Sequence, residues 1–209
     1  MESVFFTIVV LILSIIVHEV AHGYAAEALG DPTARLAGRL TLNPVPHIDL
    51  VGSIIIPAIL VMTNAGMLFG WAKPVPYNPY NLKNQRWGEA IVGIAGVATN
   101  LVIAAVFALL ARYAFLEGYE TFGTLAATVV LVNLFLGLFN LIPFPPLDGF
   151  TVLRGILPYK YSLPLRQFEE RIWGGGFLTL ILFLFVFSFF FATPFFSFVF
   201  LIFSWMIGV

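Results

Sequence analysis

The sequence His18-Glu19-Val20-Ala21-His22 combines two imidazoles with a carboxylate, the groups that proteins use to bind zinc and to activate water. On a helix, residues four apart lie on one face, so the rings of His18 and His22 can reach the same metal ion. Glu19, beside the first histidine, can take a proton from a water that the metal activates. The alternative is that both histidines are hydrogen-bonded core residues and their spacing is accidental.

The motif lies inside an apolar segment, residues 3–26, in which Glu19 carries the only formal charge. As a helix with a rise of about 1.5 Å per residue, this segment is about 36 Å long, enough to span a hydrocarbon core of about 30 Å. Ionisable groups at such depth are costly and usually functional. We therefore favour a metal site inside the membrane over the accidental spacing.

The composition indicates a membrane protein with several spans. Of 209 residues, 60% are hydrophobic and 10% are charged. The ten basic residues are scattered over loops, so no basic patch for nucleic acid is expected. The chain has no cysteine, which excludes disulfides and thiolate ligands.

We predict an all-α polytopic protein with about five to six membrane-embedded helical segments, joined by short strand-like or re-entrant loops around the metal site. Leu36, Leu40 and Leu42 alternate as in a short strand. Pro194 is expected to divide the uncharged carboxyl-terminal stretch into a span and a second span or interfacial helix. The predicted membrane segments are residues 3–26, 50–72, 90–111, 121–142 and the two parts of 172–209.

A catalytic zinc ion needs a third protein ligand, and the chain offers few candidates. Asp148 follows a helix that Pro143, Pro145 and Pro146 should end, and unwound backbone there can turn a carboxylate inward. His47, the remaining histidine, is the second candidate, although it could instead be a substrate contact or a polar residue at the membrane interface. On chemistry alone we prefer Asp148, while the pair Asp-Gly is also common in ordinary turns. Asn100, inside a predicted span, could face the same polar centre.

Two motifs together carry a family resemblance. HEVAH at residues 18–22 and NLIPFPPLDG at residues 140–149 match the paired HExxH and N-x-x-P-x-x-x-L-D-G segments of site-2 proteases, which are intramembrane zinc metalloproteases. The chain is similar in length to their compact prokaryotic branch, which lacks extra soluble domains. One departure is Gly96-Val97-Ala98-Thr99-Asn100, where the family commonly has G-P-x-x-N.

The resemblance implies one Zn²⁺ per chain held by His18, His22 and Asp148, with Glu19 as general base. Asn140 would help to bind the carbonyl oxygen under attack. The implied activity is hydrolysis of a peptide bond within or near the transmembrane segment of a single-span protein, in the cytoplasmic membrane of a prokaryotic cell. A zinc transporter or sensor and an inactive membrane scaffold are the rival functions. The sequence leaves the substrate's identity and the oligomeric state open.

We expect one membrane-embedded domain over residues 1–209, with a catalytic core at 4–155 and further membrane segments at 172–209. For residues 18–22 and Asp148 to meet at one depth, the first span and the span at 121–142 should run parallel. Residues 50–72 would then enter and leave on the same side. That arrangement places nine basic residues on one side and Arg112 alone on the other, which the positive-inside rule favours.

Overall fold

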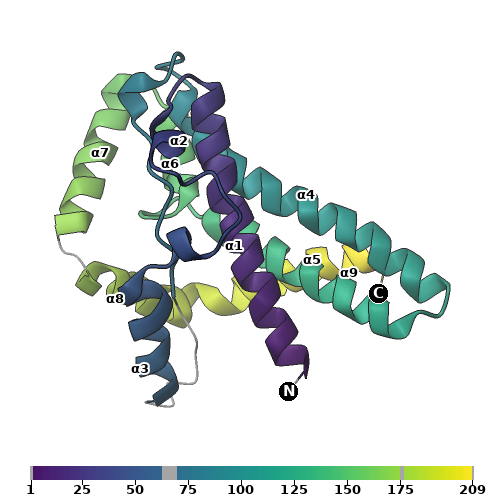
Figure 1. Cartoon of the computed structure of the whole chain (residues 1–209). Coiled ribbons are helices and arrows are strands. Elements are labelled where there is room, and N and C mark those ends of the chain that lie inside the picture. Colours follow the sequence, from purple (N-terminus) through teal and green to yellow (C-terminus); the bar gives the residue numbers. More distant parts are fainter. Residues whose placement is uncertain (1, 63–69, 175–176, 209) are drawn as a thin grey trace.

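The computed structural model describes residues 2–62, 70–174 and 177–208 (Figure 1). These residues form helices and connecting loops, without strands. The α-helices are α1 (Glu2–Ala28), α2 (Thr33–Leu36), α3 (Ile56–Met62), α4 (Gly88–Leu116), α5 (Glu120–Asn140), α6 (Asp148–Ile156), α7 (Tyr159–Gly174), α8 (Phe177–Val186) and α9 (Ala192–Ile207). Short 3₁₀ turns occur at Val45–His47 and Pro79–Asn81, and π-helical turns at Leu50–Ile55 and Phe187–Phe191.

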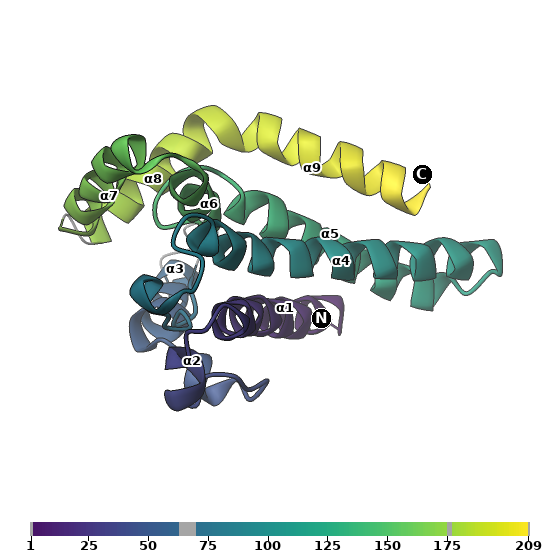
Figure 2. The same ribbon diagram turned by 90° about the horizontal axis from the view of Figure 1, so that it is seen from above.

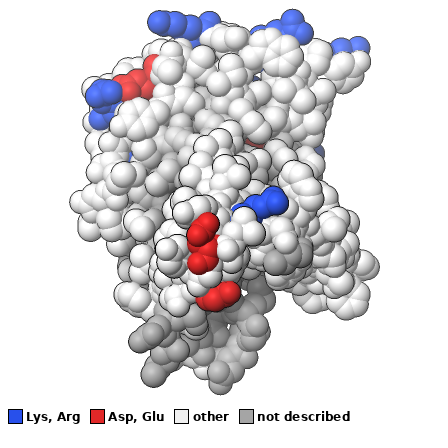
Figure 3. All heavy atoms as spheres, turned by 90° about the vertical axis from the view of Figure 1, so that its right-hand side faces the viewer, with Lys and Arg blue, Asp and Glu red and all other residues white. Residues whose placement is uncertain are grey.

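Among the described residues, four helices are long and apolar enough to cross a membrane: Val4–Ala28, Gly88–Leu116, Glu120–Asn140 and Leu182–Ile207. A shorter apolar helix covers Leu50–Ile59. The four spans and the short apolar helix make five segments, which is the lower end of the predicted five to six. Figure 3 shows Lys and Arg atoms along the upper edge of one face and, below them, a surface that is mostly uncharged apart from a small group of acidic and basic atoms near its centre.

The antiparallel hairpin of α4 and α5 forms the centre of the molecule. Small side chains line the contact between these helices, so their backbones approach closely; the buried ones include Ala104, Ala108, Ala111, Ala126 and Ala127. Figure 2 shows α9 on one side of this hairpin and α1 on the other. The amino-terminal half of α4 is thereby packed against the part of α1 that carries the histidines.

The helices α1 and α5 run parallel, as the sequence argument requires. Asn133 of α5 donates a hydrogen bond from Nδ2 to Ser14 Oγ of α1 at 2.9 Å. Further along both helices, His18 contacts Asn100, and Asn100 lies beside Gly137. The carboxyl-terminal ends of α1 and α5 therefore lie at the same end of the molecule.

The two ends of the segment at residues 50–72 meet. The Trp71 N–H donates to the Gly52 carbonyl at 3.1 Å, and Ser53 Oγ donates to the Trp71 carbonyl at 2.8 Å. The segment thus leaves the bundle where it enters, in agreement with the predicted same-side arrangement. Residues 63–69, inside this segment, lie outside the described residues.

Two local predictions are wrong. The strand expected from the alternation of Leu36, Leu40 and Leu42 is absent, because residues 33–36 form the short helix α2 and a turn follows. Pro194 does not divide the carboxyl-terminal stretch: Leu182–Ile207 is one continuous apolar helical run, in which the π-helical turn Phe187–Phe191 directly precedes α9 and its proline.

Candidate metal centre

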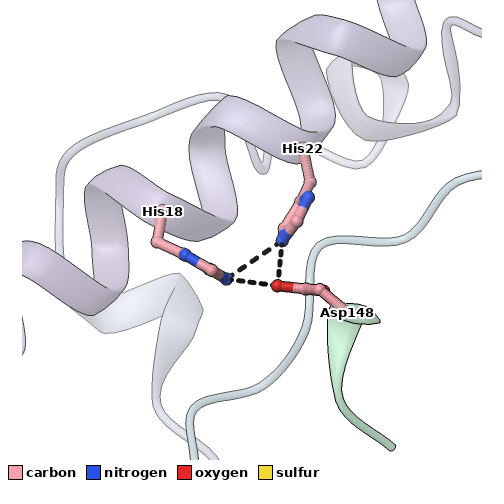
Figure 4. Close-up of side chains that lie close together, drawn as sticks. All are labelled: His18, His22 and Asp148. Atoms are coloured by element: carbon pink, nitrogen blue, oxygen red, sulfur yellow. Dashed lines mark hydrogen bonds and ion pairs between the residues drawn. The ribbon is translucent and has the colours of Figure 1, made fainter. Parts of the chain in front are cut away.

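Two segments far apart in the sequence form the centre. Helix α1 presents His18 and His22 one turn apart, both buried, with 5% and 8% of their surface exposed. Asp148 is the first residue of α6. Figure 4 shows its carboxylate pointing toward the ends of the two imidazole rings, so that all three side chains converge on one point.

A tight turn brings Asp148 to α1. Helix α5 ends at Asn140, ahead of the three prolines, and Leu147 is extended with φ −75° and ψ 154°. A Cβ on Gly149 would lie 2.1 Å from the Leu141 carbonyl oxygen, so only glycine allows α6 to start this close to the end of α5. The Asp-Gly pair therefore begins a helix, and the proline-rich turn before it places the Asp148 carboxylate.

The three atoms that could bind a metal are already at suitable separations. The Nε2 atoms of His18 and His22 are 3.1 Å apart, and Asp148 Oδ2 lies 2.9 Å from the first and 3.3 Å from the second. Two ligand atoms on a tetrahedral zinc, each about 2.0 to 2.1 Å from the metal, lie about 3.3 Å apart. Three such ligands leave a fourth position for water or substrate.

The other ring nitrogen of each histidine is held by the protein. His18 Nδ1 donates to Asn100 Oδ1 at 2.9 Å, and His22 Nδ1 donates to the Val92 carbonyl at 2.7 Å. With the proton on Nδ1, the lone pair of Nε2 is directed at the centre, and the ring cannot turn away. Asn100, whose exposed fraction is 0%, therefore orients a predicted ligand.

Gly96 of α4 lies directly against both rings. A Cβ there would be 2.5 Å from His22 Nε2 and 2.7 Å from His18 Cε1, which no side chain could tolerate. The absence of a side chain at this position therefore makes room for the imidazoles. The sequence gives one sign of this role, because Gly96 stands four residues, about one helical turn, before Asn100. Nothing in the sequence marks Val92 for this contact, because every residue has a backbone carbonyl.

Glu19 does not belong to the group of converging atoms. Its Oε2 accepts the Val75 N–H at 2.8 Å. Val75 stands between Pro74 and Pro76, which have no N–H, so this amide is the one donor of the three residues. Glu19 is thus tied to the extended segment that follows the apolar residues 50–72.

Asn140 and His47 are not in the metal-binding group either. Among the described residues, that group consists of His18, His22 and Asp148. Asn140 is the last residue of α5, and its Nδ2 donates to the Leu136 carbonyl of its own helix at 3.0 Å. His47, only 2% exposed, binds the Thr41 carbonyl through Nε2 at 2.9 Å, so it holds its own loop together.

The residues present fit a zinc ion. Two imidazole nitrogens and one carboxylate oxygen are a donor set typical of catalytic zinc. Asp148 Oδ2 is buried and accepts no hydrogen bond, which would be costly for a carboxylate oxygen without a metal or other partner. The ring orientations imposed by Asn100 and Val92 add to this fit.

Comparison with known proteins places the chain among metalloproteases. Residues 118–184 match the model of Peptidase family M50. Two curated relatives are named zinc metalloproteases. YwhC of Bacillus subtilis is 39% identical over 172 residues, which cover 79% of this chain and 75% of the relative. MJ0392 of Methanocaldococcus jannaschii is 28% identical over 189 residues, covering 88% of this chain and 44% of the relative. No solved structure gives a significant match.

These matches confirm the resemblance to site-2 proteases that the two motifs indicate. Together with the four apolar helices, they identify a multi-pass integral membrane protein. The chain belongs to peptidase family M50, and its metal cofactor is zinc.

Proposed function

We propose that the chain is an intramembrane endopeptidase that hydrolyses a peptide bond within or near the transmembrane segment of a single-span membrane protein. The observation that carries this proposal is the convergence of His18 Nε2, His22 Nε2 and Asp148 Oδ2. The two histidines lie on Val4–Ala28, a helix long enough to span the membrane.

In this proposal His18, His22 and Asp148 hold the zinc ion. When bound, zinc supplies a Lewis acid that polarises a carbonyl group and makes water reactive near neutral pH. Asn100 and the Val92 carbonyl keep the imidazoles in the required orientation during turnover.

We assign proton transfer to Glu19. The Val75 N–H holds its Oε2, which leaves Oε1 as the oxygen that takes a proton from the attacking water. Glu19 then returns that proton to the leaving amine. Asn140 donates a hydrogen bond to the carbonyl oxygen as negative charge develops, which requires its amide to leave the Leu136 carbonyl.

A substrate helix must be unwound before its carbonyl can be attacked, and an extended segment of the enzyme could pair with the opened strand. The sequence offers two segments for this role: residues 35–42, where leucines alternate as in a strand, and residues 74–79, where the prolines favour extended backbone. In the second, the Val75 and Asn78 amides are already bonded to Glu19 and Asp31. Residues 35–42 begin in α2 and continue in a turn, so pairing there would require this segment to become extended on binding.

The test uses the full chain, purified with zinc and reconstituted in vesicles with a panel of single-span peptides. Wild type should cleave at least one peptide. Glu19→Gln should keep stoichiometric zinc and lose activity by about 10² to 10⁴, the usual contribution of general acid–base catalysis.

Activity in Glu19→Gln close to wild type would contradict the assigned base. Zinc-dependent metal flux across the vesicle, with no cleavage of any peptide, would replace the protease with a transporter.

A further inference from the structure

A second group of charged side chains lies away from the metal centre, where α4, α6 and α7 meet. Glu89, in the first turn of α4, is only 8% exposed. Its two carboxylate oxygens pair with Arg154 of α6 at 2.6 Å and with Arg166 of α7 at 2.5 Å. Arg154 also forms an ion pair with Glu169 of α7. The proposed hydrolysis uses none of these groups.

A pocket of about 340 Å³ opens beside this ion-pair group. Its volume is at the lower end of the range of about 300 to 1,000 Å³ usual for small-molecule sites. Four of its lining residues carry charge, and three of those are arginines. The lining residues are Gln85, Arg86, Glu89, Arg154, Gly155, Leu157, Pro158, Ser162 and Arg166.

The charges around the pocket do not cancel. Arg86, Arg154 and Arg166 contribute three positive charges, and Glu89 with Glu169 contributes two negative charges, which leaves +1. The side chain of Arg154 is nine-tenths buried, and its Nε has no hydrogen-bond partner; nor has the Nε of Arg166. An uncompensated positive charge beside a pocket favours a bound anion of charge −1.

The position of the pocket points to a lipid as the source of that anion. Glu89 and Gly88 begin the span Gly88–Leu116, so the pocket lies at the end of the apolar region. Trp87 and Tyr161 are exposed nearby in the sequence, and such aromatic residues are enriched at the depth of lipid headgroups. Basic pockets at this depth suit anionic headgroups.

We propose that this pocket binds the phosphodiester of an anionic phospholipid headgroup, with Arg86 and Arg166 as its accessible ligands. The phosphodiester carries one negative charge and accepts hydrogen bonds from guanidinium groups in a bidentate manner. Binding would also act at a distance from the pocket. Arg154 lies on α6, and Asp148 is the first residue of the same helix, so a bound headgroup would stabilise the placement of that carboxylate.

The test is native mass spectrometry of the purified full chain with phosphatidylglycerol or phosphatidylcholine of the same acyl chains. Wild type should retain one phosphatidylglycerol and release phosphatidylcholine. Arg86→Gln and Arg166→Gln should each weaken that binding by about tenfold, because each removes a charged donor. Arg171→Gln removes an equal charge from an exposed position outside the pocket and should bind like wild type.

Size-exclusion profiles and zinc content identify variants that fold. Arg86 is the safer probe, since it is exposed and its guanidinium contacts the Trp87 ring rather than a buried acid. Equal retention of phosphatidylglycerol by wild type and a folded Arg86→Gln would overturn the proposal. So would full displacement of the lipid by millimolar inorganic phosphate, which would identify a free phosphate site. These results do not depend on peptide cleavage, so they are separable from the proposed function.

Discussion

The sequence offers Asp148 and His47 as candidates for the third zinc ligand. The structure places these two side chains in different surroundings. Asp148 Oδ2 is within 3.3 Å of both histidine Nε2 atoms, whereas His47 Nε2 is bonded to the Thr41 carbonyl. We predict that Asp148→Asn loses most of its zinc, because an amide is a weaker zinc ligand than a carboxylate. His47→Ala should keep zinc. Metal analysis of both purified variants checks the assignment, and stoichiometric zinc in Asp148→Asn with loss in His47→Ala would reverse it.

Gly96 gives a prediction that depends on the geometry of the site. In Gly96→Ala the new methyl group would lie 2.5 Å from His22 Nε2, so the ring must move from its present position. We expect zinc affinity to fall by about 10 to 100-fold, as when the groups that support metal ligands are altered. The helix itself should not suffer, because alanine is the better helix former by about 1 kcal/mol.

Gly137→Ala is the matched control for that variant. It is also a helical glycine, on α5, but the added methyl meets mainly the end of the Leu101 side chain at 3.1 Å. Competition with a zinc chelator, followed by metal analysis, compares the two affinities. Equal zinc affinity in both alanine variants would show that Gly96 does not limit the position of the imidazoles.

The site illustrates which residues a sequence can reveal. His18, Glu19 and His22 are recognisable because a fixed spacing on a helix fixes their relative positions. The approach of Asp148 depends on how a proline-rich turn packs against α1, so the sequence could only rank it above His47. The Val92 carbonyl contact depends on the crossing of α1 and α4, which leaves no trace in residue types.

At the scale of elements, Asp31 joins the end of α1 to the loop at residues 78–81. It is fully buried, and its carboxylate accepts hydrogen bonds from the Thr33 hydroxyl and amide, the Asn78 amide and Asn81 Nδ2. Burial alone would raise the pKa of Asp31, but these hydrogen bonds outweigh it and hold the pKa below its usual value. The ionised form of Asp31 therefore stabilises the folded protein.

A carboxyl group with a lowered pKa in the folded state stabilises the protein above its unfolded pKa of about 3.9. That contribution is lost as the pH falls through the lower folded pKa. We predict that Asp31→Asn lowers the free energy of unfolding by about 1 to 3 kcal/mol at pH 7, because buried donors lose a charged partner. The difference from wild type should shrink below about pH 4. Thermal unfolding in detergent at both pH values measures this, with the exposed Glu170→Gln as control. A deficit that does not change with pH would assign the effect to packing.

The fold was predictable where long apolar runs determine it, and less so where short segments depend on their surroundings. The spans of α1, α4 and α5 follow from composition and length. Leu36 to Leu42 alternates like a strand, but the part of the chain that the structure describes contains no strand to pair with it, and the chain turns instead. Pro194 resembles a helix breaker, yet the helical run continues through it, with the local change confined to the π-helical turn at Phe187–Phe191.

At the scale of the whole molecule, contacts between loops show which of them lie on the same side of the membrane. The Trp71 to Gly52 hydrogen bond closes the segment at residues 50–72, and Arg39 donates to the Lys73 carbonyl at 2.7 Å. The loops before and after this segment are therefore on one side of the membrane. At the other end of the bundle, Gly208 lies beside Arg112 of α4, so the carboxyl-terminal end of α9 is at the opposite side. Four spans arranged in this way put both termini on the side of Arg112.

The positive-inside rule then orients the molecule, since nine of the ten basic residues lie on the side of the metal centre. We predict that this side is cytoplasmic. The native chain has no cysteine, so single cysteines at the exposed positions Ala37, Tyr80, Gln167 and Glu117 can report on each loop. With an impermeant thiol reagent on intact cells, Glu117→Cys should be labelled, and the other three should react only after the membrane is permeabilised. Labelling of Ala37→Cys from outside while Tyr80→Cys stays protected would mean that residues 50–72 cross the membrane. The reverse pattern at all four positions would mean that the charge distribution does not set the orientation.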